Sequence, residues 1–369
     1  MHISIIVAVV LVAAAAIAFE LGLSSAIVEV AAGMGLGFFL DDTGRLGWLR
    51  FLANLGMLGL MFMAGFEIEP RRLKQTWKAS ACIGISSLAV PAICIYALAR
   101  YGFAVEPLGS ALIAIGLSTT SLALVFHALK ERGLLEERQG QTILAAASVV
   151  DVLSMVTLAL VLGEVGWGTA VFLLAAVPTL IGLPRIGAWV FRRYEGSIVE
   201  LELRFVLVLL VGMGFMAESV GGIHPAVVAF AIGLVLSEVV EEHAELEEKL
   251  KGIIFSFFAP VFFLEAGMRL DFGMLTPGLI VTAVIFLVAA CALKFVATAL
   301  PTRLMLGMSG TFSGLLFNYR LTFGIIAASV GLEMGVLSDG LYAVVLLVVV
   351  ASAALPMVLL RDRPCELDR

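Results

Sequence analysis

The chain has 369 residues, of which 61% are hydrophobic and only 14% are charged. Soluble domains carry about 25% charged residues, so this composition excludes an ordinary soluble domain and predicts an all-α polytopic membrane protein. The net charge of −6 is not accompanied by a basic tail, so we expect no nucleic-acid partner.

The cysteines show no CxxC spacing, so neither a disulfide framework nor a zinc site is expected, and no cofactor is implied. Cys82, Cys94 and Cys291 lie in apolar runs and are interpreted as small core residues. The N-terminal run from His2 to Phe19 lacks the basic start of a signal peptide and is taken as the first membrane helix.

An α-helix needs about 20 mainly apolar residues to cross a bilayer. Along the chain, this rule predicts about thirteen spans joined by short connections, with a short surface helix over the charged stretch from Glu241 to Lys251. The predicted spans lie near residues 3–19, 23–40, 51–66, 79–99, 107–128, 141–162, 167–184, 203–217, 223–238, 252–267, 277–300, 310–331 and 340–360.

Lysine and arginine are distributed unevenly between the two sets of predicted loops. Sixteen of them fall in one set, whereas the opposite set holds only Arg45, Arg50, Arg100 and Arg269. Basic residues collect in cytoplasmic loops, so the positive-inside rule places the first set in the cytoplasm. We therefore expect a multi-pass protein of the cell membrane with its N-terminus outside and its C-terminus inside.

An odd number of spans is typical of an inverted duplication, in which three-helix units recur with opposite topology. The natural pair here is spans 4–6 and 11–13. The fifth span carries the polar interruption Leu117–Ser121, and the twelfth carries Asn318–Gly324. Paired interruptions predict two discontinuous, crossing helices at a transporter's central site. The alternative is Ser and Thr side chains that bond back to the preceding helical turn.

Asp151 lies near the middle of the apolar run from Thr142 to Leu162. A charge at that depth costs roughly 2.5–3.5 kcal/mol on insertion scales, so an acid there is a functional-site candidate. The alternative is an acid near a helix end that reaches back to water. A carboxylate partly removed from water in a membrane cavity holds either a proton or a hard monovalent cation, but not both.

Hydroxyl groups near this depth are the candidate partners of Asp151. We expect Thr119, Thr120 and Ser148, together with carbonyl groups freed by a helix break, to replace the hydration shell of the cation.

Four other charged residues are predicted to lie within spans. Lys294 falls about two-thirds along its span, where the alternative is a long side chain that reaches the surface. Arg320 falls at the interruption of the twelfth span, where it can neutralise helix-end carbonyl groups near the pore. Glu265 is interpreted as a mouth-lining or interfacial acid, and Glu29 as a buried acid.

Several motifs, taken in order, resemble those of the monovalent cation:proton antiporter-2 (CPA2) family, which includes NapA-type sodium/proton antiporters and Kef potassium/proton systems. Gly59–Glu67 resembles the family's LLFLxGLE, and Leu117–Leu135 contains counterparts of LSSTA and LKERGLL. Ala229–Glu238 resembles GAFLAGLVLSE, and Phe257–Met268 resembles FFAPLFFxxxGM. The order of these motifs along nearly the whole chain is more specific than any one of them.

The resemblance implies a single exchanger domain over residues 1–369 with a NhaA/NapA-like fold and a homodimeric assembly. In that fold, the dimerisation part corresponds to about residues 1–66 and 203–267. The mobile core that carries the ion in an elevator-like movement corresponds to about 79–162 and 277–360, and a helix near 167–184 links the two.

The resemblance also implies roles for individual residues. Asp151 matches the ion-binding second aspartate of the family's Asp-Asp pair, and Thr119 and Thr120 fall on the crossover of the broken helices. Lys294 resembles the lysine that pairs with the first aspartate, but Val150 occupies the position of that aspartate here. Asp-Asp members tend to be electrogenic and Asn-Asp or Gln-Asp members electroneutral, whereas valine is neither.

We therefore predict a secondary transporter, not an enzyme, that exchanges Na⁺ for H⁺ one for one. The alternative is a Kef-type K⁺/H⁺ antiporter, because one carboxylate with neutral oxygens suits Na⁺, Li⁺ and K⁺ alike. A cation channel would need a continuous polar lining, and an aspartyl protease would need a second close carboxylate. An organic-anion symporter of related fold would be distinguished by anion-coupled sodium uptake.

Overall fold

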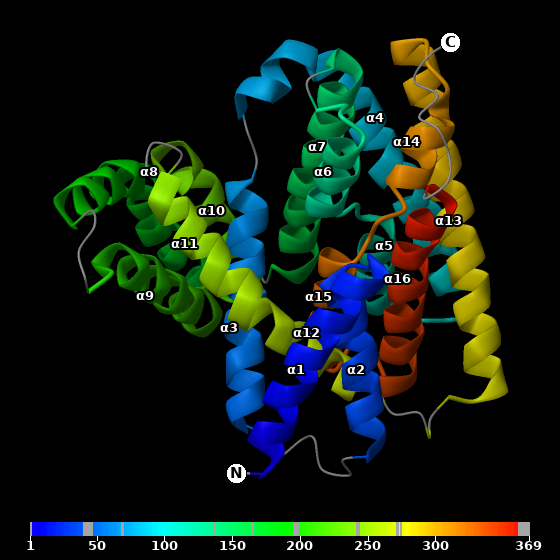
Figure 1. Ribbon diagram of the computed structural model, residues 1–369, viewed down its shortest axis with the longest axis horizontal. Coiled ribbons are helices and arrows are strands. Elements are labelled where there is room, and N and C mark those ends of the chain that lie inside the picture. Colours follow the sequence, from blue (N-terminus) through cyan, green and yellow to red (C-terminus); the bar gives the residue numbers. More distant parts are fainter. Residues whose placement is uncertain are drawn as a thin grey trace. The chain divides into compact units, whose positions relative to one another are not determined.

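The structure is a computed structural model of the chain. It describes residues 2–39, 47–67, 70–135, 137–163, 166–194, 199–240, 244–270, 273 and 275–360. Within these ranges all regular structure is helical (Figure 1). Nine of the described helices are long and apolar enough to cross a bilayer, and four shorter apolar helices accompany them. A helix suits that setting because it satisfies its backbone N–H and C=O groups internally.

Within the described residues each predicted apolar segment is mainly helical, and the bounds of the helices follow in chain order. The helices are α1 (His2–Leu21), α2 (Ser25–Phe39), α3 (Gly47–Phe66), α4 (Pro70–Ala97), α5 (Pro107–Ser118), α6 (Leu122–Glu131), α7 (Arg138–Leu162), α8 (Trp167–Tyr194), α9 (Leu201–Met216), α10 (Pro225–Val240), α11 (Ala244–Ile253), α12 (Ala259–Met268), α13 (Pro277–Leu306), α14 (Gly310–Leu316), α15 (Thr322–Glu333) and α16 (Asp339–Leu360). Short π-helical turns extend α4 and α9 and join α11 to α12, namely η2 (Leu98–Gly102), η3 (Ala217–Gly221) and η4 (Ile254–Phe258).

The chain divides into two compact units. The first contains Met1–Thr43, Pro70–Leu158 and Ala266–Arg369, and the second contains Gly44–Glu69 and Ala159–Glu265. In the first unit, α13 packs along α4, α14 and α16, and α5 packs against α4 and α15 (Figure 1). All the residues predicted to bind the ion or to support its site belong to this first unit.

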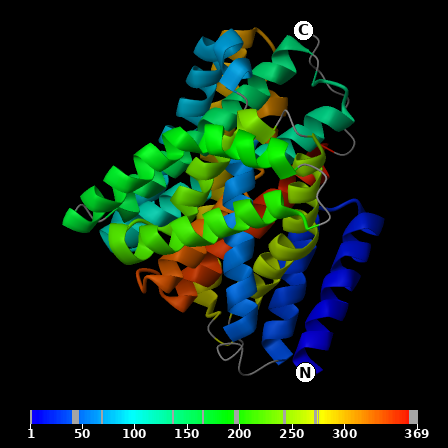
Figure 2. The same cartoon turned by 90° about the vertical axis from the view of Figure 1, so that its left-hand side faces the viewer.

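In the second unit, α3 and α10 cross closely because each contributes a glycine to the contact (Figures 1 and 2). A Cβ atom on Gly65 would lie 2.1 Å from the carbonyl oxygen of Phe230. One on Gly233 would lie 2.0 Å from the carbonyl oxygen of Phe62. Small residues let helix backbones approach each other in a membrane, where close packing drives association.

Both predicted interruptions are breaks in the helices. Helix α5 ends at Ser118 and α6 begins at Leu122, and Thr119 between them is extended. Helix α14 ends at Leu316 and α15 begins at Thr322. The prediction of a discontinuous helix at each interruption is therefore confirmed.

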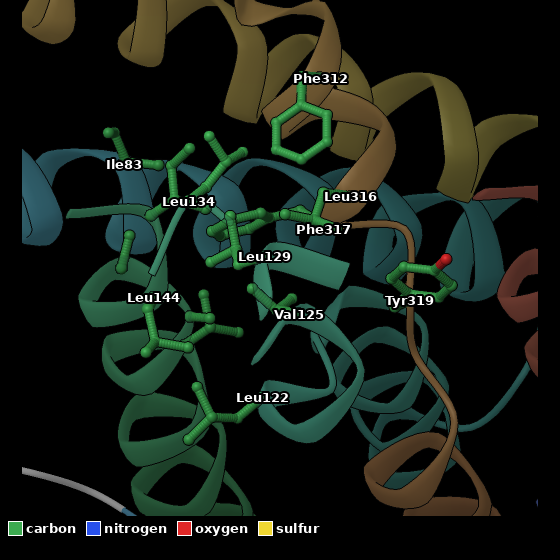
Figure 3. Packing of buried hydrophobic residues seen from close by; sticks show 14 of the residues in the cluster. Ile83, Leu122, Val125, Leu129, Leu134, Leu144, Phe312, Leu316, Phe317 and Tyr319 are labelled. Carbon is green, nitrogen blue, oxygen red and sulfur yellow. The ribbon is translucent and has the colours of Figure 1, made fainter. Parts of the chain in front are cut away.

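An apolar cluster in the first unit holds α6, α7 and α14 together (Figure 3). It fixes the start of α6 and the end of α14, which are helix ends next to the two breaks. Its members include Ile83 from α4, Leu122, Val125 and Leu129 from α6, Leu144 and Val150 from α7, and Phe312 and Leu316 from α14.

The charged stretch after α10 differs from its prediction as a separate surface helix. Glu241–His243 lie outside the described residues, and from Ala244 the helix α11 continues through η4 into α12, so that Glu245–Met268 forms one candidate span. Helix α11 buries Leu246 and Leu250, which are one turn apart, and pairs Lys249 with Glu245 at 2.8 Å. This burial explains why the helix does not end at the charged stretch.

The interpretation of the cysteines as core residues is wrong for Cys82 and Cys94, which are exposed, and Cys291 is only half-buried. In a membrane helix an apolar residue is stable against lipid as well as in a core, so an apolar run does not indicate burial.

Candidate functional site

The two helix breaks contact each other. The Thr120 hydroxyl donates to the carbonyl oxygen of Phe317 at 3.2 Å, and the Ser121 backbone N–H donates to that of Tyr319 at 2.6 Å. Interrupting a helix frees carbonyl and N–H groups that would otherwise bond within it. These bonds satisfy some of the freed groups across the crossover, and they hold the two predicted interruptions together.

The three predicted hydroxyl ligands are buried, and each donates its proton to a backbone carbonyl. Thr119 donates to Gly116 at 3.2 Å, and Ser148 on α7 donates to Leu144 at 3.2 Å. A hydroxyl has one proton and two lone pairs, so a hydroxyl whose proton is bound to a carbonyl still presents oxygen lone pairs. Thr119, Thr120 and Ser148 are therefore chemically suited to a cation.

Lys294 is fully buried and does not reach the surface, which rules out the alternative of a lysine extended to solvent. Its ammonium donates to the carbonyl oxygens of Ser118 at 2.5 Å and Ser87 at 3.0 Å. Ser118 is the last residue of α5, where helix carbonyls carry partial negative charge. Lys294 on α13 therefore binds the broken end of α5 to α4.

Arg320, between the two halves of the second broken helix, is also fully buried. Its guanidinium donates to the carbonyl oxygens of Leu117 at 2.7 Å and Ala290 at 3.1 Å, and to the side-chain oxygen of Asn318 at 2.5 Å. Asn318 in turn donates to the Gly314 carbonyl at 2.8 Å. Leu117 belongs to the last turn of α5, so one of these acceptors is a helix-end carbonyl.

Asp151 on α7 is 3% exposed, so the alternative of an acid that reaches back to water is wrong. Its carboxylate lies close enough to Lys294 for their charges to attract each other. Ser148 and Ser154 lie three residues before and after Asp151 and are also buried, so all three share one face of α7. Val150 beside Asp151 is packed in the apolar cluster and supplies no charge.

The structure thus connects most of the predicted site residues. Lys294 and Arg320 bind adjacent carbonyls at the end of α5, Thr119 and Thr120 follow directly, and Asp151 lies within electrostatic reach of Lys294. Glu29 is buried as predicted, and Glu265 is 9% exposed, in the second unit.

The hydrogen-bond partners of Lys294 and Arg320 were not predicted from the sequence. The acceptors on Ser87, Ser118 and Ala290 are backbone carbonyls, which every residue type possesses, so no sequence signal identifies them. Ser154 was also not singled out, although its spacing of three residues from Asp151 places both on the same face of α7.

One carboxylate, several hydroxyl oxygens and helix-end carbonyls are the oxygen donors that hard cations prefer. Within the described residues, no group of three or more His, Cys, Asp or Glu side chains is placed to hold a metal ion.

Comparison with known proteins gives concordant matches. The model of a family described as sodium/hydrogen exchanger, transmembrane, matches residues 6–361. The probable Na⁺/H⁺ antiporter 3 of Methanocaldococcus jannaschii is 33% identical over 333 residues, covering 84% of this chain and 82% of that protein. Cation/H⁺ antiporter 18 of Arabidopsis thaliana is 27% identical over 81% of this chain, which spans only 39% of that protein.

Among solved structures, the sodium proton antiporter MjNhaP1 from Methanocaldococcus jannaschii at pH 8 resembles the chain with a TM-score of 0.69. The match covers 98% of this chain and 97% of that one at 14% sequence identity. At this level of identity the likeness shows a shared fold and leaves the roles of individual residues to the geometry described above.

Proposed function

Because this chain belongs to the sodium/hydrogen exchanger family, and is a multi-pass membrane transporter rather than an enzyme, we propose that it exchanges Na⁺ for H⁺ at Asp151. The observation that carries the proposal is the burial of Asp151 in the unit where the ammonium of Lys294 binds the broken end of α5. A buried carboxylate needs a proton or a cation when it is moved through a membrane. Its two ligands therefore compete for one site.

In this proposal Asp151 binds the cation, and Thr119, Thr120 and Ser148 supply neutral oxygen ligands. Their hydroxyl protons are already bound to carbonyls, which leaves lone pairs to replace water around the ion. Lys294 and Arg320 support the site by neutralising the end of α5. Neither of these two side chains binds the transported ion.

We propose one-for-one, electroneutral exchange. The ammonium of Lys294 is held by two carbonyl oxygens, and Val150 gives it no second carboxylate with which to share a proton. If only Asp151 changes its bound proton during the cycle, one cation moves for each proton. If Lys294 also lost and regained a proton, the exchange would become electrogenic.

We further propose the NapA-type architecture of the CPA2 family, with thirteen spans, an inverted repeat and elevator-like movement in a homodimer. The dimerisation part would comprise about residues 1–66 and 203–267, and the mobile core about 79–162 and 277–360. The breaks in the fifth and twelfth predicted spans support the repeat. The compact unit that contains most of the core also includes Met1–Thr43, which this division assigns to the dimerisation part.

Orientation and location belong to the same proposal. The excess of Lys and Arg in one set of loops supports a cell-membrane protein with its N-terminus outside and its C-terminus in the cytoplasm.

Flux measurements in proteoliposomes test the stoichiometry. The purified protein is reconstituted, a Na⁺ gradient is imposed, and internal pH is followed while the membrane voltage is clamped with K⁺ and valinomycin. We expect proton flux whose reversal point depends on the Na⁺ and H⁺ gradients and not on voltage. A reversal point that moves with voltage would reject one-for-one exchange.

The identity of the cation is tested by replacing Na⁺ with Li⁺ or K⁺. For the experiment with K⁺, valinomycin is omitted. The voltage is instead dissipated with a membrane-permeant lipophilic anion that does not carry protons. We expect Na⁺ to support the largest flux, and a preference for K⁺ would instead favour the Kef-type alternative.

A further inference from the structure

We propose that Ser154 is an additional ligand of the transported cation, binding it through the hydroxyl oxygen beside Asp151. The inference rests on the proposed function, because it assigns a further residue to the site at which Asp151 binds the ion. It is carried by the hydroxyl group of Ser154 on α7, which has no hydrogen-bond partner within the described residues.

The hydroxyl side chains of α7 behave in two ways. Thr142, Ser148 and Thr157 each donate to the carbonyl oxygen four residues earlier, at 2.7, 3.2 and 2.7 Å. This back-bonding is the usual fate of Ser and Thr within membrane helices. Ser154 is fully buried, and its hydroxyl has no hydrogen-bond partner within the described residues. Its local environment therefore leaves the hydroxyl free for a ligand.

A buried hydroxyl without a partner is unfavourable, because it has lost its bonds to water and gained none in return. Such groups are rare in native proteins and often indicate a bound ion or water molecule. Ser154 is deep in a helix that fits a membrane span, so bulk water does not compensate it. A ligand at this position would remove the penalty.

The position of Ser154 on the helix selects the ligand. It follows Asp151 by three residues, which is close to one helical turn and about 4.5 Å along the axis. Helical side chains tilt toward the N-terminus, so Ser154 covers the turn that carries Asp151. A cation held by the carboxylate would therefore lie within reach of this hydroxyl oxygen.

Other unpartnered hydroxyls in the same unit do not share this position. The carbonyl groups of Ser87 and Ser118 bind the ammonium of Lys294, so their side chains lie near a positive charge that repels a cation. Ser329 is on α15, where the neighbouring acid Glu333 follows it by four residues and is paired with Arg269 at 2.9 Å. Ser154 is the one of these serines that follows an acid by a single turn.

The test compares Ser154→Ala with the parent in two assays on the chain of 369 residues. In proteoliposomes, we expect the Na⁺ concentration for half-maximal exchange to rise about tenfold, as for the loss of one bond to a charged group. Li⁺ needs fewer ligands because it is smaller, so its half-maximal concentration should rise less. A merely structural role of Ser154 would not change the ratio of the two.

In detergent, thermal unfolding separates ion binding from folding. Without Na⁺ or Li⁺, Ser154→Ala should be as stable as the parent or more stable, because the change removes an uncompensated hydroxyl. Saturating Na⁺ should then raise the unfolding temperature of the variant less than that of the parent. Ser329→Ala is the matched control, since it removes another buried, unpartnered hydroxyl and should leave the Na⁺ dependence unchanged.

The outcomes separate this inference from the function on which it rests. Unchanged Na⁺ dependence in Ser154→Ala, with exchange abolished in Asp151→Asn, would overturn the role of Ser154 and leave the site at Asp151 intact. Exchange that survives in Asp151→Asn would overturn the site itself. Equal effects of Ser154→Ala and Ser329→Ala would also contradict the inference.

Discussion

The ammonium of Lys294 donates to the carbonyl oxygen of Ser118, 176 residues earlier in the chain, at 2.5 Å. The bond joins α13 to the C-terminal end of α5, directly before the extended Thr119. A buried charge is stable only where hydrogen bonds or an opposite charge compensate it. Lys294 obtains this compensation from carbonyl groups and from the charge of Asp151, without an acid at position 150.

Val150→Asp tests whether the missing acid sets the stoichiometry. The new carboxylate would lie next to Asp151 and give Lys294 an ionic partner that is able to exchange a proton with it. We expect the reversal point of exchange in voltage-clamped proteoliposomes to become voltage-dependent, as in an electrogenic antiporter. Val150→Asn is the control, because it adds polarity without charge and should keep exchange electroneutral. Voltage-independent reversal in active Val150→Asp would count against this role for position 150.

Arg320→Lys tests whether the guanidinium bonds hold the two broken helices together. The arginine fork bonds Leu117, Ala290 and Asn318 together, and a lysine has neither the planar shape nor the separate donors to bond all three. At least one buried acceptor loses its donor, so we expect a loss of about 1–3 kcal/mol in the free energy of unfolding.

Thermal unfolding in detergent measures this loss, and Arg303→Lys provides the control. Arg303 is exposed near the end of α13, so the same chemical change there should have little effect. Equal stabilities of the parent and Arg320→Lys would show that the guanidinium bonds do not hold the broken helices.

Gly65→Ala and Gly233→Ala test the crossing of α3 and α10. Each added methyl group would overlap a backbone carbonyl oxygen at 2.1 or 2.0 Å, so the helices must separate. Overpacking of this kind costs about 1–3 kcal/mol, and we expect lower unfolding temperatures for both variants. Gly212→Ala on α9 is the control, because nothing lies within 4 Å of its added atom. Unfolding temperatures equal to that of the control would contradict the close crossing.

Glu67, directly after α3, predicts a dependence of stability on pH. Burial raises the pKa of its carboxyl from 4.5 to about 7, while Lys251 lowers that pKa and Glu247 raises it to smaller extents. A pKa raised in the folded state favours the protonated form. Protonated Glu67 therefore contributes to the free energy of unfolding. This contribution is complete below about pH 4.5 and is lost as the pH rises through about 7.

Glu67→Gln removes this titration and keeps a side chain of similar shape. We expect the variant to gain stability over the parent at pH 8 and to gain little at pH 5, as measured by thermal unfolding in detergent. Glu245→Gln is the control, since Glu245 is largely exposed and paired with Lys249. A gain of equal size at both pH values would disprove the titration of Glu67.

The local features of the fold could be predicted from the sequence. Long apolar runs predict the helices, and the polar interruptions at Leu117–Ser121 and Asn318–Gly324 predict the breaks, because both are properties of neighbouring residues. The fourth predicted span, near residues 79–99, agrees with the apolar segment Thr76–Gly102. Helix α4 begins earlier, at Pro70, but its backbone is non-helical at Thr76, where a charged segment precedes the apolar one.

The contacts that assemble the site could not be predicted in this way. Arg320 and Leu117 are 203 residues apart, and Lys294 and Ser87 are 207 apart. Their acceptors are backbone carbonyls, so residue type gives no indication of the pairing. The burial of Asp151, Lys294 and Arg320 was predictable because a charge within an apolar run is costly unless function or packing retains it.

Cation-induced proton release in reconstituted vesicles tests the central claim most directly, using the parent protein and Asp151→Asn with Na⁺, Li⁺ and K⁺ in turn. We predict proton release by the parent on addition of Na⁺ and none by folded Asp151→Asn with any of the three cations. Proton release by Asp151→Asn at the rate of the parent would contradict the claim that this carboxylate binds the cation and the proton in turn.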